Sequence, residues 1–235
     1  MADTSQSFEE TPTGSRSDTM YIIVSDFDGT ITIEDTTDVL VGICGNAEND
    51  QIEVEFVNGS LSNREAMERH FEIMNIGLGE YLSVVDDNIR ADPWFDTFLS
   101  HVKSTKTPFC IVSGGFVQGI RRVLGEARLE GVEVYANKLT DEDPVRTSFI
   151  TKHPVCDKPY GPCGNCKRDC IKEIRGRTDR TLVFIGDGLT DRCAIEGVDI
   201  LLAKSALASY CDDQGILYVP YKDFADVIRH LWPES

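Results

Sequence analysis

The sequence predicts a doubly wound α/β fold, in which helices cover both faces of a mainly parallel β-sheet, with a helical cap inserted after the first strand. Two observations lead to this prediction. Short, continuously apolar segments recur along the chain, and they fit strands that are buried on both faces of a parallel sheet. Helix-like segments lie between them, and this alternation is typical of α/β proteins.

Each expected strand ends at polar residues that could be reactive. The strands are Tyr21–Ser25 before Asp26, Phe109–Val112 before Ser113, Leu182–Ile185 before Gly186 and Asp187, and Ile200–Leu202 before Ala203 and Lys204. Helices are expected over Val117–Leu124, Lys167–Arg175, Arg192–Glu196 and Asp223–Leu231. Ligands of such sheets bind beyond the carboxyl ends of the strands, so we expect Asp26, Ser113 and Asp187 to converge on one site.

A long helical stretch interrupts the alternation of strands and helices. Within it, the segment Arg64–Met74 carries Met67, Phe71 and Met74 on one stripe, which is the spacing of a packed amphipathic helix. We interpret the stretch as an inserted cap and its apolar stripe as cap core. The predicted division is a leader at 1–19, a core formed by 20–35 and 106–235, and a helical cap at 36–105.

The charge of the chain is strongly acidic. Asp and Glu number 40 against 23 Lys and Arg, which gives a formal net charge of −17. No stretch gathers Lys and Arg as a nucleic-acid-binding surface would, so nucleic acid is not expected as a partner. The same field repels a negatively charged substrate, so a phosphate site has to supply positive charge locally, from a metal ion or a placed Lys.

The sequence contains no candidate membrane anchor. Its apolar runs are strand-sized and far too short to cross a bilayer. Residues 1–19 are rich in Ser, Thr, Asp and Glu and lack the pattern of a secretory signal, so we expect a disordered leader. Eight cysteines without such a signal indicate a reducing compartment, and the predicted location is the cytoplasm. The oligomeric state stays open.

The segment Asp26-Phe27-Asp28-Gly29-Thr30 is the strongest local signal for chemistry. In an extended chain residues i and i+2 face the same side, so Asp26 and Asp28 can both address one site. Two carboxylates this close favour a hard divalent cation, and one of them can instead act as an acid and base. The alternative is an ordinary turn, because Asp and Gly are common turn residues.

A second acidic segment, Gly186-Asp187-Gly188-Leu189-Thr190-Asp191, follows another expected strand. It adds two carboxylates at a strand end. Four acids that converge without neutralisation repel one another strongly. A bound Mg²⁺ would resolve this repulsion and would also offset the charge of a phosphorylated substrate.

Phosphate-binding groups are expected at two further places. Ser113 and Gly114 lie between a strand and a helix, where a hydroxyl and backbone N–H groups can hold phosphate oxygens. An ordinary N-cap turn is the alternative. Lys167 is expected at the start of another helix and could supply a fixed positive charge, although single Lys residues usually lie at the surface.

In their order along the chain, the segment starting at Asp26, then Ser113, Lys167 and the segment starting at Gly186 resemble the four motifs of haloacid dehalogenase-type phosphatases. The resemblance covers nearly the whole chain after the leader. It implies a Rossmann-like core with a helical cap after the first motif. It further implies a Mg²⁺-dependent phosphomonoesterase that acts on a small phosphorylated metabolite.

The resemblance also implies a role for each motif residue. Asp26 would attack phosphorus and form an aspartyl phosphate, while Asp28 would protonate the leaving oxygen and then activate water. The expected metal-site residues are Asp26, Asp28 through its backbone carbonyl, Asp187 and Asp191, the last of them more as an anchor behind the ligands. Ser113, Gly114 and Lys167 would hold the phosphate oxygens.

Within the superfamily the chain is most similar to the 2-hydroxy-3-keto-5-methylthiopentenyl-1-phosphate phosphatases of methionine salvage. The similarity rests on the segment Asp26–Thr32, the Cys-rich segment that runs into Lys167, and the late segment Val219–Phe224. Phosphoserine, phosphocholine and phosphoethanolamine phosphatases share the core and remain alternatives. Phosphoserine phosphatases usually carry Glu where Asp35 stands, which counts against phosphoserine.

Two parts of the cap sequence could select the substrate. Asp35 occupies a position that faces the leaving group in related enzymes, and Arg69, like Arg64, could contact an anionic or polar substrate. Exposed helix charges are the alternative for all three residues. A phosphotransferase also remains possible, because an aspartyl phosphate can pass its group to an acceptor other than water.

Four cysteines fall close together just before and within the helix expected from Lys167. They are Cys156, Cys163, Cys166 and Cys170, and the spacing of Cys163 and Cys166 is that of a zinc knuckle. The sequence therefore admits a structural Zn²⁺ site beside Lys167, with reduced thiols packed in a loop as the alternative. A catalytically silent, zinc-stabilised binding module is the third functional hypothesis.

Overall fold

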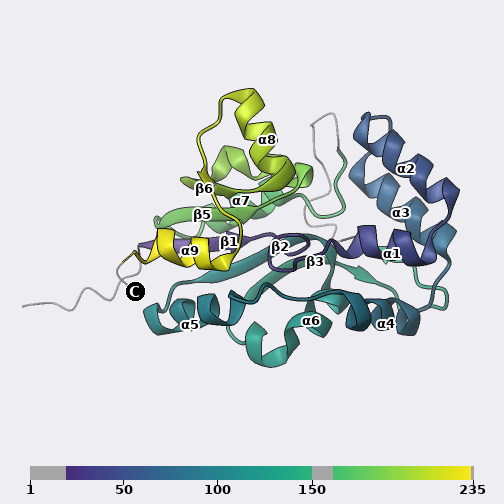
Figure 1. Cartoon of the computed structure of the whole chain (residues 1–235), viewed down its shortest axis with the longest axis horizontal. Helices are drawn as coiled ribbons and strands as arrows, with labels where there is room; N and C mark the ends of the chain where they lie inside the picture. The colour runs from purple at the N-terminus through teal and green to yellow at the C-terminus, as the bar shows by residue number, and fades with distance from the viewer. Residues whose placement is uncertain (1–19, 150–160, 234–235) are drawn as a thin grey trace, which may run out of the picture.

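The computed structural model describes residues 20–149 and 161–233 (Figure 1). Within these residues seven strands form one sheet in the order β4-β3-β2-β1-β5-β6-β7. The pairing is parallel except between β3 and β4. The strands are β1 Tyr21–Ser25, β2 Phe109–Phe116, β3 Glu133–Leu139, β4 Thr147–Ser148, β5 Thr181–Gly186, β6 Ile200–Ala203 and β7 Val219–Pro220.

The sheet is buried on both faces, as the continuous apolar runs predict. Along β1, Ile23 packs into one core cluster while Ile22 and Val24 pack into the cluster on the opposite face. The first cluster contains side chains of α5 Phe95–Thr105, α6 Val117–Leu129 and α9 Phe224–Leu231. The second contains side chains of α7 Lys167–Arg175 and α8 Ser205–Gln214. The predicted α/β fold class is confirmed.

Four helices follow the first strand and lie beyond one end of the sheet (Figure 1). They are α1 Thr36–Cys44, α2 Ala47–Val57, α3 Asn63–Met74 and α4 Leu78–Asn88. Polar side chains begin three of them: Asp35 accepts hydrogen bonds from the first turn of α1, while Asn46 and Ser62 form capping boxes at α2 and α3. The sequence therefore specifies where these helices begin.

The insertion shares an apolar cluster with the end of β2. Phe71 of α3 packs edge-on against Phe116 with ring centroids 5.0 Å apart, and Tyr81 of α4 lies 6.3 Å from the same ring. Gly119 of α6 permits this contact, because a Cβ there would lie 2.3 Å from the Tyr81 hydroxyl oxygen. The insertion is thus packed onto the core.

Helix α5 lies within the range 36–105 that was expected to form the cap, but it packs against the core. Its Phe95 and Phe98 pack edge-on against Phe224 of α9, with centroid distances of 5.1 and 4.8 Å, and belong to the core cluster. Helix α5 therefore packs with the core although the sequence placed it in the cap, and the division of the chain into cap and core stays a prediction.

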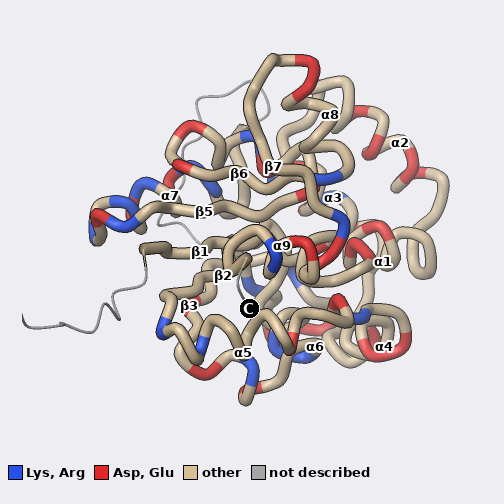
Figure 2. Tube along the Cα trace, turned by 60° about the vertical axis from the view of Figure 1, so that its left-hand side comes forward, with Lys and Arg blue, Asp and Glu red and all other residues tan. Residues whose placement is uncertain are grey.

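Several elements depart from the expectation. β3 and α8 were not predicted, and the segment expected as a helix over Arg192–Glu196 forms two short 3₁₀ turns, Leu189–Cys193 and Ile195–Gly197. The leader at 1–19 lies outside the described residues. Figure 2 shows Asp and Glu residues spread over the outer helices, including α2, α4 and α8. None of the helices in the described ranges has both the length and the apolar character needed to cross a membrane.

Candidate active site

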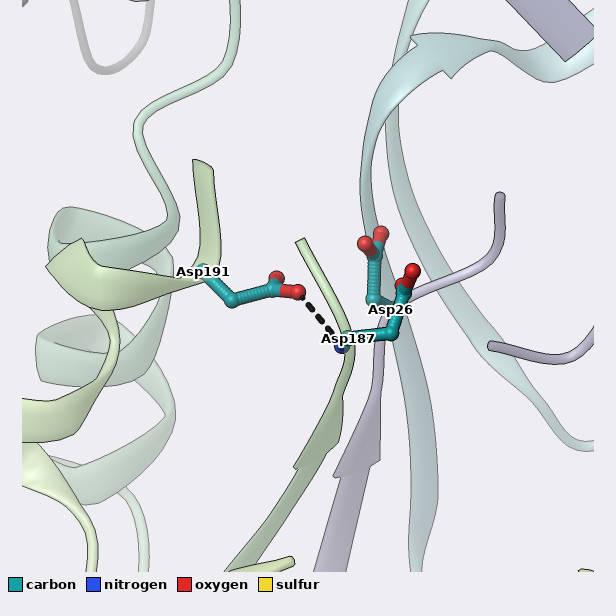
Figure 3. Close-up of side chains that lie close together, drawn as sticks. All are labelled: Asp26, Asp187 and Asp191. Atoms are coloured by element: carbon teal, nitrogen blue, oxygen red, sulfur yellow. Dashed lines mark hydrogen bonds between the residues drawn. The ribbon is translucent and has the colours of Figure 1, made fainter. Parts of the chain in front are cut away.

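Asp26 and Asp187 extend from the carboxyl ends of two neighbouring strands, β1 and β5 (Figure 3). Ser25 pairs with Ile185 in the register of the sheet, and the Asp26 N–H donates to the Ile185 carbonyl at 2.9 Å. A carboxylate oxygen from each of Asp26, Asp187 and Asp191 lies within 4.8 Å of the others. The strand ends thus bring three acids, from segments about 160 residues apart in the printed sequence, to one point.

Gly29 makes the turn after β1 possible. Its φ is +68°, and a Cβ at this position would lie 2.5 Å from Asp187 Oδ2. Thr30, the next residue, donates from Oγ1 to Asp187 Oδ1 at 2.8 Å. The first motif therefore both makes room for the Asp187 carboxylate and orients it.

We expect Gly29→Ala to displace Asp187 and to weaken divalent-cation binding by at least about ten-fold, because a Cβ would occupy the place of its carboxylate. The matched control is Gly215→Ala, at φ +64° with no atom within 4 Å of the added Cβ. Both variants carry similar backbone strain, of roughly 1–2 kcal/mol. Cation titration of activity in both variants is the measurement; equal cation affinity would contradict the role of Gly29.

Asp28 lies beside Ser113, which belongs to the neighbouring strand β2. The Ser113 hydroxyl is 3.4 Å from Asp28 Oδ2, and the Thr36 N–H donates to Oδ1 at 3.2 Å. Gly115 completes the contact, because a Cβ there would lie 2.6 Å from Asp28 Oδ2. Burial raises the pKa of Asp28, with the hydrogen bonds from Thr36 opposing the rise.

Lys167 joins two of the acids. Its ammonium group lies 2.7 Å from Asp26 Oδ2 and 2.5 Å from Asp191 Oδ1, and the side chain is buried. The other oxygen of Asp191 accepts the N–H groups of Asp187 and Gly188 at 3.0 and 2.9 Å. Both Asp191 oxygens are therefore engaged by the protein, which fits an anchor behind the metal ligands better than a ligand.

The acids outnumber the single buried amine. Burial raises the pKa of Asp26 well above its usual value, and Asp191 adds to this rise while Lys167 opposes it. Burial also raises the pKa of Asp187 to about 6, with Asp191 adding to the effect. For Lys167, burial acts to lower the pKa, but the charges of Asp191 and Asp26 raise it above its usual value. The centre therefore lacks positive charge.

A Mg²⁺ ion fits this donor set. Asp26 and Asp187 offer hard carboxylate oxygens from two strand ends, and the close approach permitted by Gly29 keeps Asp187 beside the turn that carries Asp28. The ion would supply the positive charge that the centre lacks. We therefore assign Asp26, Asp187 and the Asp28 backbone as the proposed metal ligands.

Two asparagines hold the loop around Ser113 in place. Asn165 Nδ2 donates to the Ser113 carbonyl at 3.0 Å and to the Tyr135 carbonyl at 2.8 Å, and Asn137 Nδ2 donates to the Gly114 carbonyl at 2.7 Å. Sequence reasoning missed both asparagines. Asn165 stands two residues before Lys167, and this proximity was the one available signal.

A cavity of about 140 Å³ opens over Asp26 and Lys167. Core residues form its floor and helices α1 to α3 form its wall. The lining residues are Asp26, Asp28, Asp35, Thr37, Asp38, Glu53, Phe56, Asn63, Ala66, Met67, His70, Gly114, Gly115, Lys167 and Thr190.

Of the three residues considered for substrate contact, one lines the cavity and two do not. Asp35 lines the cavity, and burial raises its pKa to about 7, with the charges of Asp28 and Asp38 adding to the rise. Arg69 does not line it and pairs instead with Glu55 at 3.3 Å. Arg64, likewise outside the lining, pairs with Glu68. Sequence reasoning missed Asp38, Glu53 and His70 as cavity residues.

The predicted zinc site is not supported. Cys163 and Cys166 pack with Cys193, whereas Cys170 lies in the core cluster under α7 and donates from Sγ to Asn165 Oδ1 at 3.2 Å. Cys156 lies outside the described residues. Among the residues with described positions, the three-aspartate centre is the one group of acids, histidines or cysteines arranged to hold a metal.

Comparisons with known proteins identify the family to which the chain belongs. The chain is 29% identical over 89% of its length to a 2-hydroxy-3-keto-5-methylthiopentenyl-1-phosphate phosphatase of Exiguobacterium, covering 96% of that protein. It is 24% identical over 89% of its length to the polyol phosphate phosphatase PYP1 of Saccharomyces cerevisiae, covering 92% of it. The fold matches that of a phosphoserine phosphatase solved as a phospho-aspartyl intermediate analogue, with a TM-score of 0.65, 16% identity and coverage of 89% and 97% of the two chains. The model of the haloacid dehalogenase-like hydrolases matches residues 23–196, and the chain belongs to this family.

Proposed function

We propose that this phosphatase of the haloacid dehalogenase family hydrolyses a small phosphomonoester with Mg²⁺, through an aspartyl phosphate on Asp26. The observation that carries the proposal is the contact between Asp26 and Lys167 on the floor of the cavity. A nucleophilic carboxylate beside a buried ammonium group can receive a phosphoryl group whose negative charge the ammonium then offsets.

Asp26 is oriented for in-line attack. Its Oδ2 lies against Lys167, and its Oδ1 accepts the Phe27 N–H at 2.7 Å, so the carboxylate cannot rotate freely. Ser113 and the Gly114 N–H stand on the neighbouring loop, where they would bind the equatorial phosphate oxygens. The P–O bond to the leaving group breaks as the bond to Asp26 forms.

Asp28 is the proposed general acid and base. Burial raises its pKa, which favours the protonated form that a proton donor needs. It would give this proton to the leaving oxygen and then remove a proton from the water that hydrolyses the aspartyl phosphate. Bound Mg²⁺ would supply charge neutralisation for the transferring phosphoryl group.

Methionine salvage is the proposed pathway, with 2-hydroxy-3-keto-5-methylthiopentenyl-1-phosphate as the substrate. The Exiguobacterium relative and the late segment Val219–Phe224 support this choice. Phosphoserine, phosphocholine or phosphoethanolamine is the alternative substrate. A silent binding module is a weaker alternative, because Asp26, Asp28 and Asp187 are all present. A phosphotransferase is a less favoured alternative that would use the same aspartyl phosphate. The cytoplasmic location stays a prediction.

Removal of divalent cations tests the proposal. We expect a chelator to reduce hydrolysis of p-nitrophenyl phosphate by at least about two orders of magnitude, and added Mg²⁺ to restore it, because the buried acids would be left without a neutralising charge. The measurement is the steady-state rate at fixed ionic strength. Ca²⁺ serves as the control cation, since it favours longer bonds and higher coordination than Mg²⁺. Full activity in the chelated enzyme would refute the metal role.

A further inference from the structure

The cavity wall contributed by the cap is acidic. Asp35 and Asp38 enter from the start of α1, and Glu53 enters from α2. Among the described residues that line the cavity, Lys167 is the one Lys or Arg, and it is already engaged by Asp26 and Asp191 on the floor. A leaving group that extends from the phosphate toward the cap therefore meets carboxylates.

A buried hydrogen-bond chain fixes the direction of Glu53. The Asn46 N–H donates to Asn49 Oδ1 at 3.0 Å, which assigns the amide so that Asn49 Nδ2 faces His70 Nδ1, also at 3.0 Å. With Nδ1 as acceptor, the ring hydrogen resides on Nε2, which donates to Glu53 Oε1 at 2.9 Å.

This chain is built into the packing of the α2–α3 pair. Asn49 and His70 are almost completely buried, with exposed fractions of 0% and 1%, whereas the Glu53 side chain remains 43% exposed. His70 holds one oxygen of Glu53, which leaves the other oxygen available in a residue that lines the cavity. Glu53 is thus positioned as a hydrogen-bond acceptor at the cavity wall.

We propose that Glu53, positioned by His70, selects substrates whose leaving group presents hydrogen-bond donors and carries no carboxylate. This inference rests on the proposed phosphatase function and names its substrate class. A hydroxyl or an ammonium group can donate to Glu53. A leaving-group carboxylate would lie near Glu53 and Asp38, where the described wall residues include no Lys or Arg to balance its charge, and like charges in a partly dry site repel.

Two matched pairs of compounds test the effect of a carboxylate on the leaving group. Glycerol 3-phosphate differs from 3-phosphoglycerate by a hydroxymethyl group in place of a carboxylate, and O-phosphoethanolamine differs from O-phosphoserine by the missing carboxylate. We expect kcat/KM to favour the member without a carboxylate by at least about ten-fold in both pairs. Comparison of the two favoured members then identifies hydroxyl or ammonium as the better donor.

Glu53→Gln tests the residue, because it keeps the shape and removes the charge. We expect the preference to fall by at least about ten-fold in both pairs, through a higher KM for the members without a carboxylate and a lower KM for the others. Glu55→Gln is the matched control on the same helix. Glu55 pairs with Arg69 and does not line the cavity, so its variant should keep the wild-type preference.

His70→Ala tests positioning, and His70→Gln, which retains a side-chain N–H donor, should recover part of the preference. A loss of preference in the first variant that the second does not recover at all would overturn the role of His70. Hydrolysis of p-nitrophenyl phosphate by the wild type distinguishes failure of the proposed function from failure of this inference. If the wild type does not hydrolyse this compound, the proposed function fails. If it does, equal rates within both pairs, or an unchanged preference in Glu53→Gln, would overturn the inference alone.

Discussion

Asp26→Asn is expected to reduce kcat by at least about three orders of magnitude while the protein stays folded, because the amide keeps the shape of the side chain but cannot attack phosphorus. The fold should survive because Asp191, the other of the two buried acids that pair with Lys167, stays in place. Steady-state kinetics and thermal unfolding of both proteins are the measurements. In addition, only the wild type should gain the mass of one phosphoryl group when it is quenched in acid during turnover.

Asp223→Asn is the matched control for this experiment. Asp223 begins α9 by accepting the N–H groups of Ala225 and Asp226, and Asn is an equally good residue at such a position. The control should therefore retain both activity and stability. Wild-type turnover by Asp26→Asn would remove Asp26 as the nucleophile, whereas similar losses in both variants would indicate a general effect of the substitution.

Lys167→Met is expected to lower both stability and activity. The ammonium group is the shared ion-pair partner of Asp26 and Asp191, whose side chains are buried, so its loss leaves two buried carboxylates without this positive charge. Breaking such a buried pair costs about 3–5 kcal/mol in the free energy of unfolding. Activity should fall at least about 100-fold, because the transferring phosphoryl group loses a fixed positive charge.

Urea unfolding in chelator measures the stability change, and steady-state kinetics with Mg²⁺ measures the activity change. Lys172→Met is the control in the same helix; its side chain is 65% exposed and its ion-pair distance to Asp169 is 3.9 Å, so the free energy of unfolding should change by less than about 1 kcal/mol. If Lys167→Met were as stable as Lys172→Met, the ion pairs of Lys167 would not contribute to the fold.

Asp26 and Asp187 could be predicted as site residues because each directly follows a strand. An apolar run such as Tyr21–Ser25 predicts a buried strand, and a parallel sheet then places Asp26 and Asp187 at the same edge. No knowledge of side-chain contacts is needed for that step. For the same reason Ser113 was found, although its loop depends on the distant Asn165.

The wall of the site could not be predicted in the same way. Helical spacing reveals the apolar stripe of α3, but it does not show which polar residues of α2 and α3 face the substrate. Glu53 faces the cavity because His70, 17 residues away on another helix, holds it there. Arg69, one residue earlier, looked equally suitable in the sequence and lies outside the cavity.

The packing of α5 shows a similar limit. The helical pattern of Phe95–Thr105 continues that of the preceding helices, so local spacing assigns α5 to the insertion. Its placement depends on Phe95 and Phe98 meeting Phe224, which lies more than 120 residues further along the chain. Periodicity identifies a helix, whereas its neighbours are chosen by tertiary packing.

The aromatic cluster of Phe71, Tyr81 and Phe116 limits how freely this architecture can be rearranged. Two of these rings belong to the insertion, while Phe116 ends the strand that contains Ser113. Gly119 lies so close to the Tyr81 hydroxyl group that a Cβ would not fit between them. An unrelated cap grafted onto this core would leave a hole around Phe116 and a groove at Gly119. Exchange of caps between relatives, whether by recombination or by design, therefore requires matched changes in the core at these two positions.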